Sequence, residues 1–109
     1  MAQIKIPTRN DFPSYSQRIE LEGVIYNLSF RFNERMNRWI MDIQDQEEND
    51  ILIGIVMLTS VPLLQQYIKE GLPPGDFILL HRDGTDTNAG RFDLGDAVQL
   101  FYAESGDLV

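Results

Sequence analysis

Residues 18–33, with the sequence RIELEGVIYNLSFRFN, decide the fold class of this chain of 109 residues. Around Gly23, apolar side chains alternate with polar ones, at Ile19, Leu21, Tyr26, Leu28, Phe30 and Phe32. A period of two is typical of antiparallel strands that bury one face. A glycine between two such runs favours a tight turn. We therefore predict a β-hairpin that turns at Glu22 and Gly23.

The flanking sequence extends this pattern. Alternation returns at Trp39, Met41 and Ile43, and weakly at residues 3–6. Residues 51–58 are continuously apolar, which favours a central strand buried on both faces. Two more strands are expected at residues 77–80 and 97–102. Residues 62–70 have the apolar spacing of a short helix, with Ser60 as its cap.

These elements predict an all-β fold, a mainly antiparallel small barrel or sandwich of about six or seven strands with one short helix. Residues 1–15 carry Pro7 and Pro13 and no sustained period, so we expect an extended N-terminal arm there. Residues 16–109 contain no linker, repeat or low-complexity run. We expect them to form a single β domain.

The charge balance narrows the possible partners. The formal net charge is −8, and the nine basic residues are scattered. Binding to phosphates or to anionic lipids requires clustered Lys and Arg, so we expect no nucleic acid and no membrane as partner. The absence of cysteine excludes disulfides and Cys-based sites. The first residues lack the apolar core of a signal peptide, so we expect the protein to stay in a cytoplasm until it assembles.

A candidate cation site lies in the loop that runs from Asp83 to Asp96. Its carboxylates are Asp83, Asp86, Asp93 and Asp96, and glycines lie between them in the sequence. A calcium loop of the EF-hand type requires oxygen ligands at positions 1, 3 and 5, glycine at 6 and glutamate at 12. Counting from Asp83 puts Asn88 at position 6 and Leu94 at position 12, so the pattern fails. Turn formation is the favoured interpretation, and a metal-dependent hydrolase built on this loop is kept as an alternative.

The remaining candidate residues give no catalytic constellation. His81 is the only histidine, and a general base needs a nucleophile and an orienting partner. The aromatic residues suit a core better than a base-stacking platform; they are Tyr26, Phe30, Phe32 and Trp39. The hairpin arginines suit a solvated tip or an acidic neighbour; they are Arg31, Arg35 and Arg38. We therefore predict no catalytic, cofactor-binding or metal-binding residues, no cofactor, and no enzyme activity.

The order of these motifs resembles a known family. The carrying residues are Leu21-x-Gly23-x-x-Tyr26-x-Leu28, then Asn33, then Trp39-x-x-Asp42-Ile43, followed by Leu63-Leu64, Tyr67, Leu72-Pro73-Pro74-Gly75, Asp86, Leu94-Gly95 and Leu100-x-Tyr102. Over residues 17–103 this resembles the cyanophage-type baseplate plug domain of contractile-tailed bacteriophages. The resemblance implies a structural virion protein on the tail axis at the baseplate hub, with no catalysis and no cofactor. The motif residues have architectural roles in this interpretation.

The sequence therefore leaves three candidate functions. The first is a baseplate plug or hub-associated component, whose partners are other tail and baseplate hub proteins, contacted through residues 1–15 or 83–96. The second is a small β-barrel module that binds proteins without catalysis through a sheet edge. The third is the metal-dependent hydrolase. Whether copies of the chain form a homo-oligomer in the virion is left open.

Overall fold

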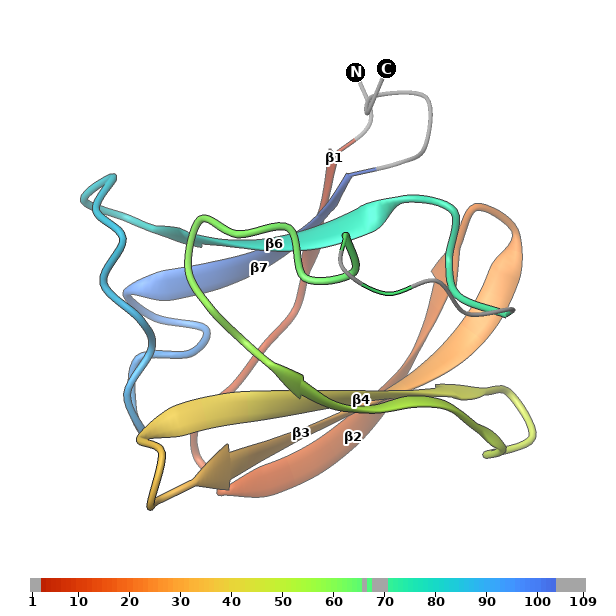
Figure 1. The fold of residues 1–109 in the computed structure, drawn as a ribbon, viewed down its shortest axis with the longest axis horizontal. Coiled ribbons are helices and arrows are strands. Elements are labelled where there is room, and N and C mark those ends of the chain that lie inside the picture. The colour runs from red at the N-terminus through yellow and green to blue at the C-terminus, as the bar shows by residue number, and fades with distance from the viewer. Residues whose placement is uncertain (1–2, 66, 68–70, 104–109) are drawn as a thin grey trace.

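The computed structural model describes residues 3–65, 67 and 71–103. Within these ranges the chain forms two antiparallel sheets. The first has the order β2-β3-β4-β5 and the second the order β1-β7-β6. The strands are β1 (Gln3–Ile6), β2 (Ser14–Leu21), β3 (Val24–Asn33), β4 (Arg38–Asp45), β5 (Asp50–Val56), β6 (Asp76–His81) and β7 (Val98–Ala103). The sheets lie one above the other (Figure 1), so the all-β prediction is confirmed in its sandwich form.

The predicted hairpin is present between β2 and β3. Leu21 pairs with Val24, which leaves Glu22 and Gly23 as a two-residue turn. Their φ angles are 51° and 85°. Positive φ at both positions is the type I′ geometry, whose twist matches that of the flanking strands. The alternation of β3 then directs Tyr26, Leu28 and Phe30 into the core, as predicted.

The core lies between the two sheets. Its largest fully buried side chains come from both of them: Trp39, Tyr102, Phe30, Phe77, Ile6, Leu21, Leu28, Met41, Ile43, Ile55, Met57 and Leu79. Burying one such side chain stabilises a fold by about 1.5–3 kcal/mol relative to leaving it in water. The second sheet is therefore held to the first mainly by apolar packing.

The prediction of a central strand at residues 51–58 is wrong. β5 lies at the edge of its sheet, and Ile53 is 47% exposed. The pairing with β4 is irregular, and Gly54 has a φ of 85°. The Gly54 N–H donates at 2.8 Å to the carboxylate side chain of Asp42 in the neighbouring β4. A continuous apolar run cannot by itself distinguish a central strand from a bulged edge strand.

The predicted short helix is absent from the described part of its range. Residues 62–65 and 67 are not helical, while residues 66 and 68–70 lie outside the described residues. The Leu63 N–H donates to the Phe77 carbonyl at 2.9 Å, and the Leu64 N–H donates to the Asp76 carboxylate at 2.7 Å. These bonds tie the start of the segment to β6, and the Tyr67 N–H donates to the Leu64 carbonyl at 3.0 Å in a single turn.

The same segment joins the two sheets along one side of the sandwich. After β5, the Met57 N–H donates to the Trp39 carbonyl at 2.9 Å, and the Ser60 N–H donates to the Leu79 carbonyl at 2.8 Å. On the opposite side β1 and β2 are both outermost strands.

The proposed division into an arm over residues 1–15 and a domain over 16–109 stays a prediction. Within the first of these, β1 pairs with β7, as the weak alternation at residues 3–6 suggested.

Candidate assembly surface

A candidate assembly surface forms where the N-terminal segment meets the loop between β6 and β7. The Asn10 carboxamide donates to the Phe92 carbonyl at 2.8 Å and to the Leu94 carbonyl at 3.0 Å. The Arg91 guanidinium donates in return to the Asn10 carbonyl. These bonds join segments about 80 residues apart in the sequence, namely 9–12 and 91–94.

Two aromatic rings stand on this surface. Phe12 is 55% exposed and Phe92 is 68% exposed, the highest values among the large hydrophobic residues that the structure describes. The Cζ atom of Arg9 lies 5.3 Å from the Phe12 ring centroid, and that of Arg91 lies 4.7 Å from the Phe92 centroid. Both distances are typical of cation–π contacts. We call Arg9, Phe12, Arg91 and Phe92 the aromatic–arginine surface.

Buried contacts hold the loop beneath this surface in one conformation. The Trp39 indole N–H donates to the Gly90 carbonyl at 2.9 Å, and the Gly90 N–H donates to the Asp93 carboxylate at 2.9 Å. A side chain at Gly95 would place its Cβ 2.3 Å from the Thr8 carbonyl oxygen. The approach of the N-terminal segment to the loop therefore requires glycine at this position.

Part of the positive charge of the aromatic–arginine surface is paired with a carboxylate. Arg9 donates to Asp11 through its Nε atom at 2.6 Å. This hydrogen bond lowers the pKa of the Asp11 carboxyl below its usual value. Both side chains of the pair are 54% exposed. An exposed ion pair contributes little to stability.

The loop carboxylates do not converge on a cation site. Asp93 binds the Gly90 N–H, Asp96 lies 3.9 Å from Arg82, and the Asp83 carboxylate lies 3.8 Å from His81. Across the described ranges, no three His, Cys, Asp or Glu side chains are grouped to hold a metal ion. His81 itself accepts the Asp83 N–H at 3.1 Å, a bond that closes the turn after β6. These contacts are those of turn residues.

The aromatic and basic residues singled out in the sequence have mainly structural roles. Trp39, Phe30 and Tyr26 are buried, and the Phe32 and Trp39 rings pack edge to face with centroids 5.6 Å apart. Arg31 pairs with Asp42 at 3.2 Å across the sheet. Arg38 donates to the Asn37 carbonyl at 2.8 Å. Neither a stacking platform nor a cluster of free arginines results from these contacts.

The sequence interpretation named segments 1–15 and 83–96 as contacts to neighbours but did not single out Phe12 or Phe92. A usable signal was present, because each is a large apolar residue within a polar turn, between Asp11 and Pro13 or between Arg91 and Asp93. Neither residue belongs to an alternating pattern. A phenylalanine that no strand pattern directs into the core is therefore a candidate for an exposed contact.

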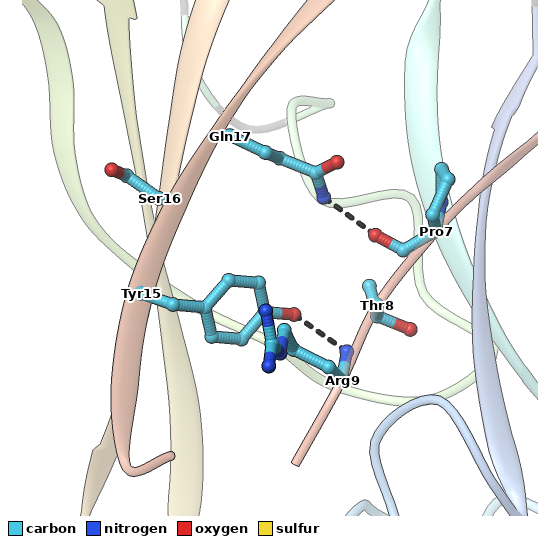
Figure 2. A pocket seen from close by; sticks show the side chains of 6 residues that line it. All are labelled: Pro7, Thr8, Arg9, Tyr15, Ser16 and Gln17. Atoms are coloured by element: carbon cyan, nitrogen blue, oxygen red, sulfur yellow. Dashed lines mark hydrogen bonds between the residues drawn. The ribbon is translucent and has the colours of Figure 1, made fainter. Parts of the chain in front are cut away.

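A small pocket lies beside this surface, at the side of the sandwich where β1 and β2 are outermost. It has a volume of about 250 Å³ and is lined by Pro7, Thr8, Arg9, Tyr15, Ser16 and Gln17. Figure 2 shows the Tyr15 and Gln17 side chains reaching from β2 across to the backbone of residues 7–9. We call this cavity the edge pocket.

The opposite end of the sandwich carries a buried polar link. The Tyr102 hydroxyl accepts the Gly75 N–H at 2.7 Å and donates to the Glu22 carboxylate at 2.5 Å. Burial, together with the hydrogen bond to Glu22, raises the pKa of Tyr102 above its usual value. The tyrosine therefore stays neutral and links the β2–β3 turn to β7.

Comparison with known proteins identifies the family. The sequence matches a family described as "Cyanophage baseplate Pam3 plug gp18" over residues 1–105. No curated protein matches the chain. In the described part of the chain, no helix is long and apolar enough to cross a membrane. With nearly its whole length matched, the chain belongs to the cyanophage baseplate plug family, and it is a structural component of the phage baseplate.

Proposed function

We propose that this protein acts without catalysis as a plug on the tail axis, seated against its baseplate neighbours through the aromatic–arginine surface. As a baseplate component it lies in the virion tail and contacts other baseplate proteins. Its position on the tail axis and the surface through which it contacts its neighbours are what we propose. We also propose that the protein waits in the host cytoplasm before assembly.

The observation that carries the proposal is the exposure of Phe12 and Phe92 on a rigid support. Aromatic residues and arginine are enriched in the buried centres of protein interfaces, where a few of them supply most of the binding energy. The hydrogen bonds of Asn10 and Trp39 hold the backbone at Phe92 and Gly90 before binding, and Arg9 lies over the Phe12 ring. A prearranged surface loses less conformational entropy on binding than a mobile one.

Charge supports the choice of protein neighbours over other partners. A net charge of −8 opposes contact with nucleic acid and with anionic lipid. The two rings with their arginines suit a protein surface that combines apolar groups with carboxylates. A non-catalytic role fits the separate contacts of the loop carboxylates, a hydrogen bond for Asp93 and charged neighbours for Asp83 and Asp96.

The test is incorporation of the double variant Phe12→Ala/Phe92→Ala into tails that lack the wild-type protein. Loss of two interface centres of about 2 kcal/mol each would lower occupancy at least tenfold. Quantitative mass spectrometry of purified tails measures the occupancy. The matched control is Val24→Ala, which removes a 50% exposed apolar side chain at the other end of the sandwich.

Wild-type occupancy of the double variant would refute the contact surface. If imaging of intact tails found no density for the protein at the baseplate axis, the plug position itself would be wrong. Thermal melting of each variant separates a binding defect from a folding defect, because exposed side chains contribute little to the folded state.

A further inference from the structure

The free edge of β2 differs from the other sheet edges of the described residues. β1 has four residues and is followed by Pro7. β5 is interrupted by register shifts and by Gly54, and the outer side of β6 is covered by the segment that contains Ser60 and Leu63. Short length, bulges and covering segments are the usual protections of an edge. β2 has eight regularly paired residues, and of the usual protections it carries only charged side chains, at Arg18 and Glu20.

The ladder determines which backbone groups of β2 are free. The Phe32 N–H donates to the Pro13 carbonyl at 2.8 Å, so this pair is hydrogen-bonded. Hydrogen-bonded and non-bonded pairs alternate along an antiparallel ladder. The polar backbone groups of Tyr15 and Gln17 therefore point toward β3. Those of Ser14, Ser16, Arg18 and Glu20 point outward to the free edge.

The edge pocket lies directly beside these free groups. The Gln17 side chain donates to the Pro7 carbonyl at 2.6 Å, and the Tyr15 hydroxyl accepts the Arg9 N–H at 2.8 Å (Figure 2). Side chains, not backbone hydrogen bonds, thus span the gap between β2 and residues 7–9. The Thr8 hydroxyl oxygen is buried and has no hydrogen-bond partner in the described structure. Because this oxygen is buried away from the space of the edge pocket, the polar side chain that a ligand in the pocket meets is Arg9.

We propose that the free edge of β2 binds an extended segment of a neighbouring baseplate chain as an added strand, with a carboxylate side chain of that segment entering the edge pocket. Main-chain hydrogen bonds to Ser14, Ser16, Arg18 and Glu20 hold the added strand, and the edge pocket selects its side chain. The inference rests on the proposed seating of the protein among baseplate neighbours.

The chemistry of the edge pocket selects the carboxylate. Alternate side chains of an added strand point to one face of the sheet, so one of them faces the edge pocket. There it meets the Arg9 guanidinium, a charged hydrogen-bond donor that lines the pocket. Before binding, Arg9 is paired with the exposed carboxylate of Asp11. On binding, a carboxylate of the added segment replaces Asp11 as the partner of Arg9. A globular neighbour without an extended segment cannot reach between β2 and residues 7–9.

Ser16→Pro and Ser16→Ala form the matched pair for the test. Proline removes the outward N–H of Ser16, and proline is tolerated on an edge strand whose N–H faces solvent. Alanine keeps this N–H. In competition with wild type for tails that lack the protein, we expect Ser16→Pro to incorporate at least tenfold less, and Ser16→Ala within twofold of wild type. Equal incorporation of the two variants would overturn the inference.

Arg9→Gln keeps the test decisive if Ser16→Pro does not fold. It removes the positive charge from a side chain that is 54% exposed, so we expect a nearly unchanged melting temperature together with weaker incorporation. Unchanged incorporation would argue against the carboxylate contact. If a map of the intact baseplate shows the protein at the axis with no strand paired to β2, the added strand is refuted but the proposed function is not. Absence of the protein from the baseplate axis refutes the proposed function as well.

Discussion

At the scale of single residues, Tyr102 makes the most informative polar contact. Its ring is fully buried, and its hydroxyl joins the Gly75 N–H to the Glu22 carboxylate. A Cβ at Gly75 would lie 2.7 Å from the tyrosine hydroxyl oxygen and 2.1 Å from the Ala103 carbonyl oxygen. No larger residue fits there, so the hydroxyl and the Gly75 N–H are held in contact by the packing.

Tyr102→Phe should destabilise the protein by about 1–3 kcal/mol, because the buried Gly75 N–H loses its acceptor. The control is Tyr15→Phe, which removes an acceptor from the exposed Arg9 N–H; its effect should stay near 1 kcal/mol or less. Urea denaturation at pH 7 measures both. Equal effects of the two substitutions would show that the Tyr102 link adds nothing specific.

The raised pKa of Tyr102 also gives the sign of a pH effect. Above pH of about 10 the tyrosine ionises in the unfolded chain while it stays protonated in the folded one. The unfolded state then binds fewer protons, so stability falls as the pH rises. The fall above pH 10 should be shallower in Tyr102→Phe than in wild type.

At the scale of elements, the loop between β6 and β7 depends on glycines in two different ways. Gly84 and Gly95 both have positive φ angles, of 74° and 82°. A Cβ at Gly84 would meet nothing within 4 Å, whereas one at Gly95 would overlap the Thr8 carbonyl. The first glycine serves the local turn, and the second serves the contact that positions the aromatic–arginine surface.

Gly84→Ala and Gly95→Ala therefore separate backbone strain from steric overlap. Positive φ alone costs about 1–2 kcal/mol for alanine, which is the full effect expected at Gly84. Gly95→Ala should cost more than this and should also reduce incorporation into tails, because residues 9–12 would have to move. Chemical denaturation and the tail-incorporation assay measure the two effects. Similar results for both variants would contradict this division of roles.

At the scale of the whole molecule, the sandwich is joined on one side and open on the other. Residues 57–63 carry hydrogen bonds from the first sheet to the second, while β1 and β2 are linked by the side chains of Tyr15 and Gln17. Adding a strand at β2 would complete the open side. The two faces proposed for contact adjoin there, since Phe12 precedes β2 by two residues. One neighbour can thus engage both.

β1 tests whether the N-terminal segment is part of the cooperative unit. Ile6 is fully buried, and Ile4 is 37% exposed. We expect Ile6→Ala to destabilise the protein by about 2–5 kcal/mol, and Ile4→Ala by much less, in a single thermal transition. A small effect at Ile6 would mean that residues 1–15 behave as an arm independent of the domain.

Much of the fold was predictable from local patterns. The β2–β3 hairpin and the strand that contains Trp39 follow from alternation and from Glu22-Gly23, because a period of two and a type I′ turn are set by neighbouring residues. Asn33, one of the motif residues with an architectural role, accepts the Met36 N–H through its carboxamide oxygen at 3.1 Å. The predicted helix is absent from the described residues 62–65 and 67, where the chain is hydrogen-bonded to β6. The central position of residues 51–58 was wrong because β5 is an edge strand with an irregular pairing at Gly54.

The sequence by itself determined the strand pattern, the acidic charge and the family, because all three are properties of residue order. The tertiary structure alone decided which surfaces are available. It brought Asn10 beside Phe92, left the rings of Phe12 and Phe92 in solvent, and left the outer groups of β2 without a neighbouring strand. These features depend on contacts between segments up to about 80 residues apart, whose pairing is fixed by the packing of the whole core and not by any local pattern.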